Sequence, residues 1–405
     1  MNRRSTMSRA VLLLGAMLIV CGCASVRDRR PVPEPLVDLA EIPGIPQARH
    51  WADGPMSNET EDWFELPDEV IQRRHSGVYA RDHHYLAISG GGPNDAYGAG
   101  LLNGWTRSGT RPEFVWVTGI STGALIAPFA FLGSDYDWIL EEVYTTLSTK
   151  DIITERSTLK AITGDAFTST RPLAKLIARY VDDEIVEAIA AEHRRGRRLV
   201  IGTTNIDAAR PVMWSIGAIA DSDSPDKKKI IQDVMLASAS IPVAMPPVFF
   251  EVEADGQKYD EMHVDGGATT QVFLYPAGFE WDRVLERLKV TGTPKVWVIR
   301  NAKLKPDWAA VRPKVGAIAS RTVKSLLRTQ GAGDLVRIYM LAVRDGLTFS
   351  YTSISEEFDE QAEEAFDPVY MKRLFDYGAG LGESGRAWIE YDREDLLGDS
   401  QKGKP

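Results

Sequence analysis

The chain has 405 residues, of which 44% are hydrophobic and 26% charged. These proportions are ordinary for a globular protein, and the length allows two or three domain-sized units. The formal charge of −10 disfavours a nucleic-acid partner, which would require a basic surface. No spacing of His, Cys, Asp and Glu suggests a metal site, so we expect no metal.

The first 22 residues have the pattern of a lipoprotein signal peptide. Three arginines precede an apolar run over residues 10–20, which at about eleven residues is too short to span a bilayer as a helix. Cys23 follows the small Gly22 and resembles the lipidated cysteine of a bacterial lipobox. Ala24 after it resembles lipoproteins of the Gram-negative outer membrane. A secretory peptide that happens to contain cysteines is the alternative. Both cysteines of the chain lie here, so no disulfide is expected after cleavage.

Residues 23–78 are predicted to form a proline-rich tether and lead-in. Five prolines between positions 31 and 46 break helices and favour stiff, extended chain, which suits a spacer behind a lipid anchor. Trp51, Trp63 and Phe64 lie among acidic residues further on. We expect these three to be an apolar strip that packs on the folded domain.

A buried strand followed by a glycine-rich loop opens the folded domain. Residues 84–89 predict the strand, and Gly90, Gly91 and Gly92 begin a loop that leads into a helix. The spacing fits neither a dinucleotide fingerprint nor a P-loop, which also needs Gly-Lys-Ser/Thr. Backbone N–H groups of such a loop could instead form an oxyanion hole. Removing one donor from an oxyanion hole usually lowers the catalytic rate by about 10²- to 10³-fold.

The next predicted strand enters a Gly-x-Ser-x-Gly turn. An apolar run over residues 115–117 leads to Gly119, Ser121 and Gly123, and residues 124–132 predict a helix. This order is typical of a nucleophile elbow with Ser121 at its apex. A side chain at either glycine would collide across so tight a turn. The alternative interpretation is a glycine-rich turn in which Ser121 has no catalytic role.

A serine nucleophile needs a base, and Asp265 is the candidate. No histidine follows His263, so the Ser, Asp/Glu, His order of α/β-hydrolases lacks its base. Asp265 is followed by Gly266 and Gly267, which let the backbone turn and bring the carboxylate to another loop. A buried carboxylate within about 3 Å of the hydroxyl can take its proton. The alternative interpretation of residues 265–267 is a hairpin Asp-Gly turn without a catalytic role. His263 is expected either to support Asp265 or to be a structural histidine.

Together these motifs resemble the patatin-like phospholipase family, whose Ser/Asp dyad hydrolyses lipid acyl esters. The segment Ala237-Ser238-Ala239-Ser240-Ile241-Pro242 adds to the likeness, which covers roughly residues 79–298. The resemblance implies that Ser121 is the nucleophile, Asp265 the base, and Gly90 to Gly92 the oxyanion hole. No cofactor is implied.

The glycine loop departs from the family pattern in one respect. Many members have an arginine after the glycines, whereas Pro93-Asn94-Asp95 stands here. We expect Asn94 or backbone contacts to hold the loop, and Asp95 to be the N-cap of the following helix.

The sequence therefore predicts an α/β protein with the patatin-like three-layer α/β/α fold and a central, mainly parallel sheet. Residues 79–300 form the hydrolase domain, and residues 301–405 form a helical region packed on it. The predicted function is hydrolysis of lipid acyl esters at the outer membrane of a Gram-negative bacterium, with the chain anchored through Cys23. Hydrolysis of small esters or thioesters, and a non-catalytic acyl-binding lipoprotein, remain the alternatives.

Overall fold

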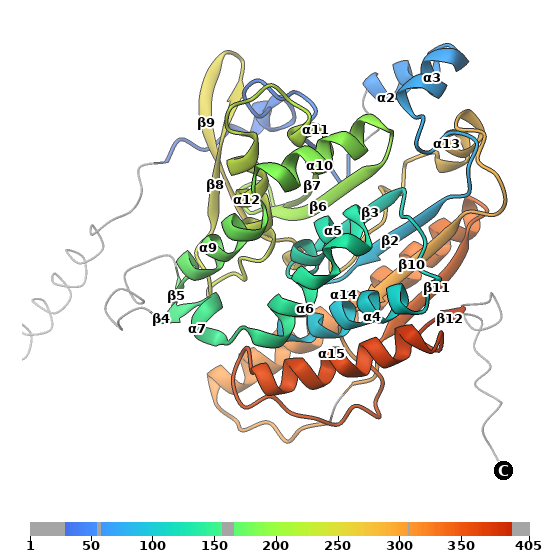
Figure 1. The fold of residues 1–405 in the computed structure, drawn as a ribbon. Helices are drawn as coiled ribbons and strands as arrows, with labels where there is room; N and C mark the ends of the chain where they lie inside the picture. The colour runs from blue at the N-terminus through green and yellow to red at the C-terminus, as the bar shows by residue number, and fades with distance from the viewer. Residues whose placement is uncertain (1–28, 55–57, 156–165, 307, 391–405) are drawn as a thin grey trace, which may run out of the picture.

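The computed structural model describes residues 29–54, 58–155, 166–306 and 308–390, and a ten-stranded β-sheet lies at its centre (Figure 1). The sheet runs in the order β1 (Arg49–Trp51), β7 (Arg210–Ser215), β6 (Arg198–Asn205), β3 (Trp116–Ile120), β2 (His84–Ile88), β10 (Lys295–Arg300), β11 (Thr348–Ser353) and β12 (Ile389–Glu390). The strands from β6 to β11 are parallel, and the edge pairs are antiparallel. Strands β8 (Val248–Ala254) and β9 (Gln257–Asp265) form an antiparallel hairpin, and β9 also pairs with β6. The predicted mainly parallel sheet is confirmed.

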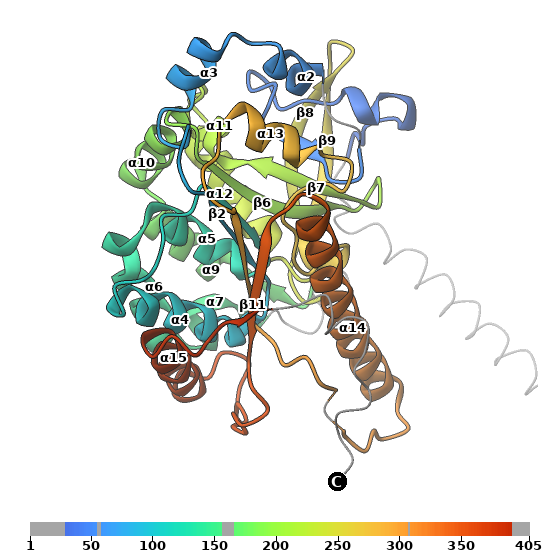
Figure 2. The same cartoon turned by 90° about the vertical axis from the view of Figure 1, so that its right-hand side faces the viewer.

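Helices cover both faces of this sheet (Figure 2). Strand β2 shows why: Leu86 and Ile88 contribute to one buried apolar cluster, while Tyr85 and Ala87 contribute to another, as alternation along a strand requires. The first cluster lies under α4 (Ala96–Arg107), α5 (Gly123–Leu132) and α6 (Asp137–Thr146), and the second under α13 (Trp281–Arg287) and α14 (Val315–Arg344). A strand buried on both faces is apolar throughout, which explains the run at 84–88.

Further helices, short helical turns and strands complete the described part of the chain. They are η2 (Glu34–Leu39), α2 (Asn58–Phe64), α3 (Asp68–Arg74), η3 (Gly92–Asp95), η4 (Ser134–Tyr136), α7 (Thr149–Ile152), β4 (Thr154–Glu155), β5 (Thr168–Ser169), α9 (Arg171–Tyr180), α10 (Asp183–Arg194), α11 (Ile216–Ala220), α12 (Lys227–Ser238) and η5 (Gly266–Ala268).

The C-terminal region, predicted to be helical and packed on the core, also contributes strands to the central sheet. Strand β11 continues the sheet beside β10, and α15 (Pro368–Glu383) packs closely on α4. The close approach depends on glycine: a Cβ atom at Gly100 would lie 2.0 Å from the Phe375 carbonyl oxygen, and one at Gly104 2.0 Å from that of Ala379. The sequence does not predict β11 because residues 348–353, Thr-Phe-Ser-Tyr-Thr-Ser, contain no apolar run and lie between two long helical patterns.

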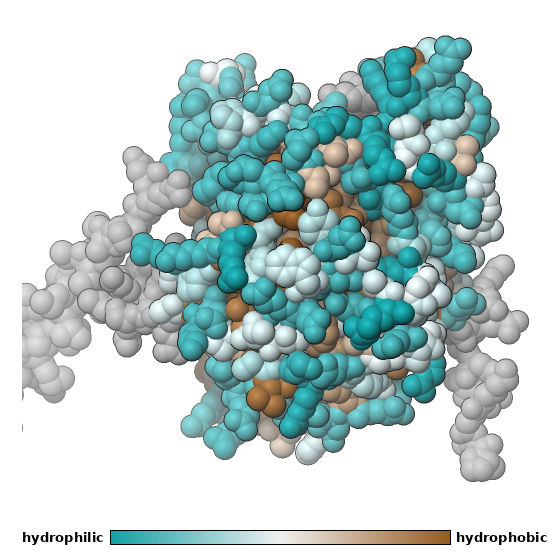
Figure 3. Space-filling view, in the orientation of Figure 1, coloured by the Kyte–Doolittle hydropathy of each residue, from teal (hydrophilic) through white to brown (hydrophobic). Residues whose placement is uncertain are grey.

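The face of the molecule seen in Figure 3 is mostly hydrophilic, with apolar groups in small patches. Among the helices that the structure describes, none combines the length and the apolar character needed to cross a bilayer. Residues 1–22 and Cys23 lie outside the described residues. The signal peptide and its lipidation therefore stay predictions.

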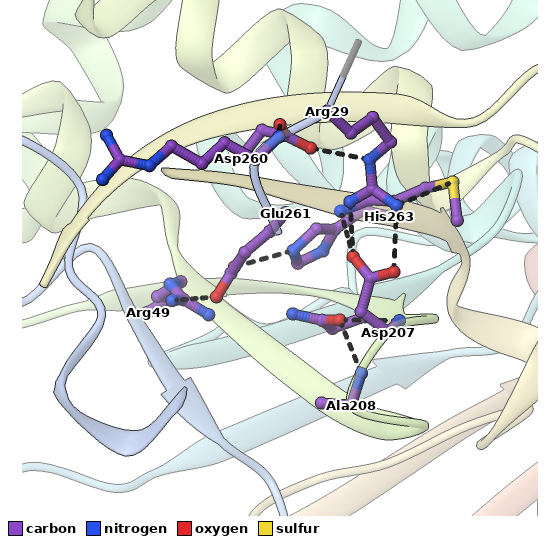
Figure 4. A network of polar contacts seen from close by, with 10 residues as sticks. Arg29, Arg49, Asp207, Ala208, Asp260, Glu261 and His263 are labelled. Atoms are coloured by element: carbon purple, nitrogen blue, oxygen red, sulfur yellow. Dashed lines mark hydrogen bonds and ion pairs between the residues drawn. The ribbon is translucent and has the colours of Figure 1, made fainter. Parts of the chain in front are cut away.

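The segment from residue 29 to residue 54, within the predicted proline-rich tether and lead-in, packs on the domain. Strand β1 pairs with β7, and Ile42, Ile45 and Ala48 are buried in the core. A polar network also holds it: the Arg49 guanidinium donates to Glu261 at 2.8 Å (Figure 4). The prolines do exclude long helices here, but they do not prevent intervening apolar side chains from burying themselves.

Candidate active site

Ser121 occupies the sharp turn between β3 and α5. Its φ angle is +55°, a conformation that is unusual for a residue with a side chain and is common where backbone strain serves a site. A Cβ atom at Gly119 would lie 2.6 Å from the Gly123 carbonyl oxygen, and one at Gly123 would lie 2.5 Å from that of Ser89. The turn is closed this tightly because neither position carries a side chain.

The Ser121 hydroxyl donates a hydrogen bond to Asp265 Oδ2 at 2.6 Å, across 144 residues of sequence. Asp265 is the last residue of β9, and its other carboxylate oxygen accepts the Gly267 N–H at 2.6 Å. Its own N–H donates to the Ser240 carbonyl at 2.9 Å. A Cβ atom at Gly266 would lie 2.5 Å from the Gly202 carbonyl oxygen, so this glycine lets the aspartate loop lie against β6.

The Asp265 carboxylate is almost completely buried, with 5% of the residue exposed. Burial raises the pKa of Asp265 to about 6, although the hydrogen bonds from Ser121 and Gly267 act in the opposite direction. A carboxylate with such a pKa is ionised at neutral pH and is a stronger base than an exposed aspartate. It is therefore suited to accept the proton of the hydroxyl that it contacts.

Ser238 supports the turn from a third segment, at the end of α12. Its hydroxyl accepts the Ser121 N–H at 3.0 Å and donates to the Gly202 carbonyl of β6 at 2.6 Å. Ser238 is fully buried. The sequence places Ser238 only in a segment of family likeness and does not predict this role, because the contact with Ser121 crosses 117 residues.

The predicted oxyanion loop lies directly beside the serine. A Cβ atom at Gly90 would lie 2.5 Å from Ser121 Cβ. The N–H groups of Gly91 and Gly92 converge on one acceptor, the Thr122 hydroxyl, at 3.3 and 2.8 Å. The loop thus presents two converging donors next to the nucleophile, and Thr122 occupies them in this structure.

Residues at the end of β10 hold the loop where the family arginine is missing. Asn301 donates through its N–H to Ser89 Oγ and through Nδ2 to the Ser89 carbonyl, both at 2.9 Å. Arg300 Nη1 lies 3.5 Å from the Gly90 carbonyl oxygen. Asn94, the expected support, accepts the Tyr370 hydroxyl at 2.7 Å. Asn301 and Arg300 lie more than 200 residues after the loop, so the local sequence contains no signal for either.

Asp95 is not the N-cap of α4, and this prediction is wrong. A helical turn, η3, precedes α4 directly, so Asp95 has helical backbone angles and its side chain makes no capping bond, whereas a cap requires non-helical backbone. The carboxyl is fully buried, and within the described residues neither oxygen makes a hydrogen bond. Burial raises the pKa of Asp95 well above its usual value, and the carboxyl packs against Gly91, where an added Cβ atom would lie 2.5 Å from Asp95 Oδ1.

His263 has a structural role. One ring nitrogen pairs with Thr203 Oγ1 at 2.9 Å. The other pairs with Glu261 at 3.1 Å (Figure 4). The ring is fully buried, and burial lowers its pKa. Within the described residues, neither Ser121 nor Asp265 makes a hydrogen bond to a histidine, so the site contains a serine and an aspartate without an imidazole.

Exposed apolar side chains lie beside the aspartate loop. Ile241 and Val243 follow Ser240, whose carbonyl accepts the Asp265 N–H. Phe167 is also exposed, and its N–H donates to the Val243 carbonyl at 3.1 Å. An apolar group bound next to the dyad would therefore meet apolar surface.

A cavity of about 710 Å³ lies elsewhere, at the opposite ends of the strands. Its lining includes His83, Trp116 and Arg198, which stand at or before the first residues of β2, β3 and β6, whereas Ser121 follows the last residue of β3. The cavity is therefore separate from the dyad. Within the described part of the chain, no cluster of His, Cys, Asp and Glu could hold a metal ion.

Residues 86–277 match the family model described as patatin-like phospholipase. Among solved structures, VipD from Legionella pneumophila is similar, with 12% sequence identity and a TM-score of 0.32, over 78% of this chain and 68% of that chain. No curated protein matches the chain.

Proposed function

Because the chain carries a patatin-like phospholipase domain over residues 86–277, we propose that it is a serine hydrolase that cleaves acyl esters of lipids. The observation that carries this proposal is the 2.6 Å contact between Ser121 Oγ and Asp265 Oδ2 at a strained strand-to-helix turn. A hydroxyl becomes a useful nucleophile when a base of suitable pKa is held against it.

Hydrolysis then proceeds in two steps. Ser121 Oγ attacks the acyl carbon while its proton passes to Asp265, and the resulting tetrahedral intermediate expels the alcohol, which takes that proton from Asp265. An acyl group now esterifies Ser121. Water attacks the same carbon, Asp265 accepts a proton from it, and the collapse of the second intermediate releases the carboxylic acid and returns the proton to Ser121.

The negative oxygen of each intermediate is stabilised by the N–H groups of Gly91 and Gly92. Both donors now point to Thr122 Oγ1, so the substrate oxygen takes the place of this hydroxyl when Thr122 changes its rotamer. Donors fixed in advance in this way usually contribute about 10²- to 10³-fold each in rate.

The exposed Phe167, Ile241 and Val243 beside the aspartate loop support an acyl chain as the group that lies next to the ester. We place the chain at the outer membrane of a Gram-negative bacterium, anchored through lipidated Cys23. Replacing Cys23 by Ser should move the protein from the membrane fraction to the soluble fraction of the envelope. Unchanged fractionation would contradict the anchor.

The deciding experiment measures acyl release from phospholipid micelles and from p-nitrophenyl esters of increasing chain length. Ser121→Ala and Asp265→Asn should each lower the rate by about 10³-fold or more while the thermal transition is retained. A preference for the shortest esters would favour the small-ester hydrolase. Absence of turnover on every ester, together with no labelling of Ser121 by a fluorophosphonate, would favour the acyl-binding lipoprotein.

A further inference from the structure

The first half of α14 extends into solvent. None of the residues from 315 to 330 is buried, whereas from Gly331 onward the helix contributes buried side chains to the core. Figure 2 shows this end of α14 reaching beyond the body of the molecule. A helical segment of this length without packing partners has marginal stability in water. A surface that covers the first half of α14 would therefore stabilise it.

One side of α14 carries a stripe of exposed apolar side chains, which Thr322, Ser325, Thr329 and Gly333 interrupt. At about 100° per residue, six large apolar side chains fall on the same side of the helix, and their exposure ranges from 43% for Val336 to 86% for Val315. The six are Val315, Ile318, Leu326, Val336, Met340 and Val343. At about 1.5 Å per residue the stripe is roughly 42 Å long. It faces away from the domain, because Leu335 and Ile338 on the other side of the helix are buried.

Basic residues accompany the stripe although the whole chain is acidic. Between positions 302 and 330 the sequence has one acidic residue, Asp307, and seven basic ones: Lys303, Lys305, Arg312, Lys314, Arg321, Lys324 and Arg328. On the helix, Arg321, Lys324 and Arg328 lie outside the apolar stripe. Trp308, just before the helix, is 88% exposed. A helix with an apolar face, a Lys/Arg face and a nearby tryptophan is typical of segments that lie in a membrane interface.

We propose that the apolar stripe of α14 and its basic flank bind the surface of an anionic lipid bilayer, with the helix lying in the interface. Charge complementarity selects this occupant, since two copies of so basic a segment would repel each other. The middle of α14 lies beside the catalytic loop: Gln330 donates to the Thr269 carbonyl, and Asp334 accepts the Gln271 N–H at 2.7 Å. Binding would therefore bring the loop after Asp265 close to the lipid, but it does not require Ser121 chemistry.

Vesicle binding tests this surface with matched variants. The protein should begin at Ser25, which retains every described element and removes both cysteines, and should carry Ser121→Ala so that lipid is not consumed. We expect it to bind phosphatidylglycerol-containing vesicles more tightly than phosphatidylcholine vesicles, and less tightly at high salt. Leu326→Ser should weaken binding by about tenfold or more, whereas Val369→Ser, at a similarly exposed position on α15, should not.

A charge-reversal pair separates local from net charge. Lys324→Glu with Arg328→Glu should weaken binding to anionic vesicles by about tenfold or more. Arg171→Glu with Lys175→Glu changes the net charge by the same amount at exposed positions of α9 and should leave binding nearly unchanged. Equal losses in both double variants would overturn the proposal in favour of a non-specific charge effect.

Contact can also be located directly, because the protein from Ser25 has no cysteine. An environment-sensitive fluorophore on Leu326→Cys should shift to the blue on anionic vesicles and be quenched by lipid-borne quenchers. The same fluorophore on Val369→Cys should do neither. An unchanged Leu326→Cys spectrum, or a concentration-dependent dimer that Leu326→Ser abolishes, would overturn the lipid assignment, the second result in favour of another copy of the chain.

Failure of this proposal can be distinguished from failure of the proposed function. With Ser121 intact, Leu326→Ser should hydrolyse a soluble p-nitrophenyl ester at the parent rate but release less acyl chain from anionic vesicles. If no ester is hydrolysed and the binding differences persist, only the hydrolase proposal fails. If esters are hydrolysed and the variants bind vesicles like the parent, only the α14 proposal fails.

Discussion

The Ser238 hydroxyl accepts the Ser121 N–H at 3.0 Å while donating to the Gly202 carbonyl at 2.6 Å. One buried hydroxyl thus satisfies the backbone of both the nucleophile turn and β6. Its removal leaves a buried N–H and a buried C=O without this partner, which usually costs about 1–3 kcal/mol of stability, and it loosens the turn that aims Ser121.

We therefore expect Ser238→Ala to lower kcat by about tenfold or more and to lower the free energy of unfolding. Steady-state kinetics and urea denaturation measure the two effects. Ser240→Ala is the matched control, because the Ser240 hydroxyl donates only to the Leu236 carbonyl at the end of the same helix. If both variants keep the parent kcat, Ser238 does not position the nucleophile.

The activity should follow the ionisation of Asp265. Burial raises the pKa of this carboxyl to about 6, and only the ionised form can accept the Ser121 proton. We expect kcat/KM for a soluble ester to fall as the pH decreases through about 6 and to reach a plateau above it. A pH profile that stays flat down to pH 4 would contradict this prediction, because the rate would then not depend on a carboxyl with a raised pKa.

Gly123 should tolerate no side chain, since an added Cβ atom would lie 2.5 Å from the Ser89 carbonyl oxygen and 2.8 Å from that of Ile88. Both neighbours are backbone atoms of the β2 end, so Gly123→Ala must displace either the strand or the turn. We expect a large loss of activity and a lower melting temperature. In contrast, Gly333→Ala in α14 meets no atom within 4 Å and should raise the free energy of unfolding by about 0.5–1 kcal/mol. Similar melting temperatures for the two variants would argue against this packing.

Breaking the buried pair of Arg49 and Glu261 should destabilise the fold strongly. Their side chains are 6% and 2% exposed, so Arg49→Met removes the guanidinium from the buried Glu261 carboxylate and leaves it paired with the His263 ring. Removing one partner of a buried ion pair usually costs about 3–5 kcal/mol. The surface pair of Lys258 and Glu251 is 68% and 59% exposed, so Lys258→Met should change the free energy of unfolding very little. Chemical denaturation measures the free energy of unfolding of the two variants. An equal small loss for both would mean that the segment around β1 contributes little to the fold.

Local patterns in the sequence determined the fold class and the candidates for chemistry. The apolar runs before Gly90 and before Gly119 predicted two buried strands, and both strands exist at the centre of the sheet. Such features are readable because a strand, a turn or a helix start depends on residues only a few positions apart. The sequence also indicated Asp265 as the base, because no histidine stands in a suitable position after Ser121.

Only the tertiary structure decided which of these residues meet. The contacts of Ser121 with Asp265 and Ser238, and of Asn301 with Ser89, each join positions more than 100 residues apart, and no local spacing encodes them. The tertiary structure also decided which polar groups are buried. Asp95 lies fully buried against the glycine loop, where local rules predicted a helix cap. The segment around β1 lies in the core, because apolar side chains between prolines find a surface there that only the assembled sheet provides.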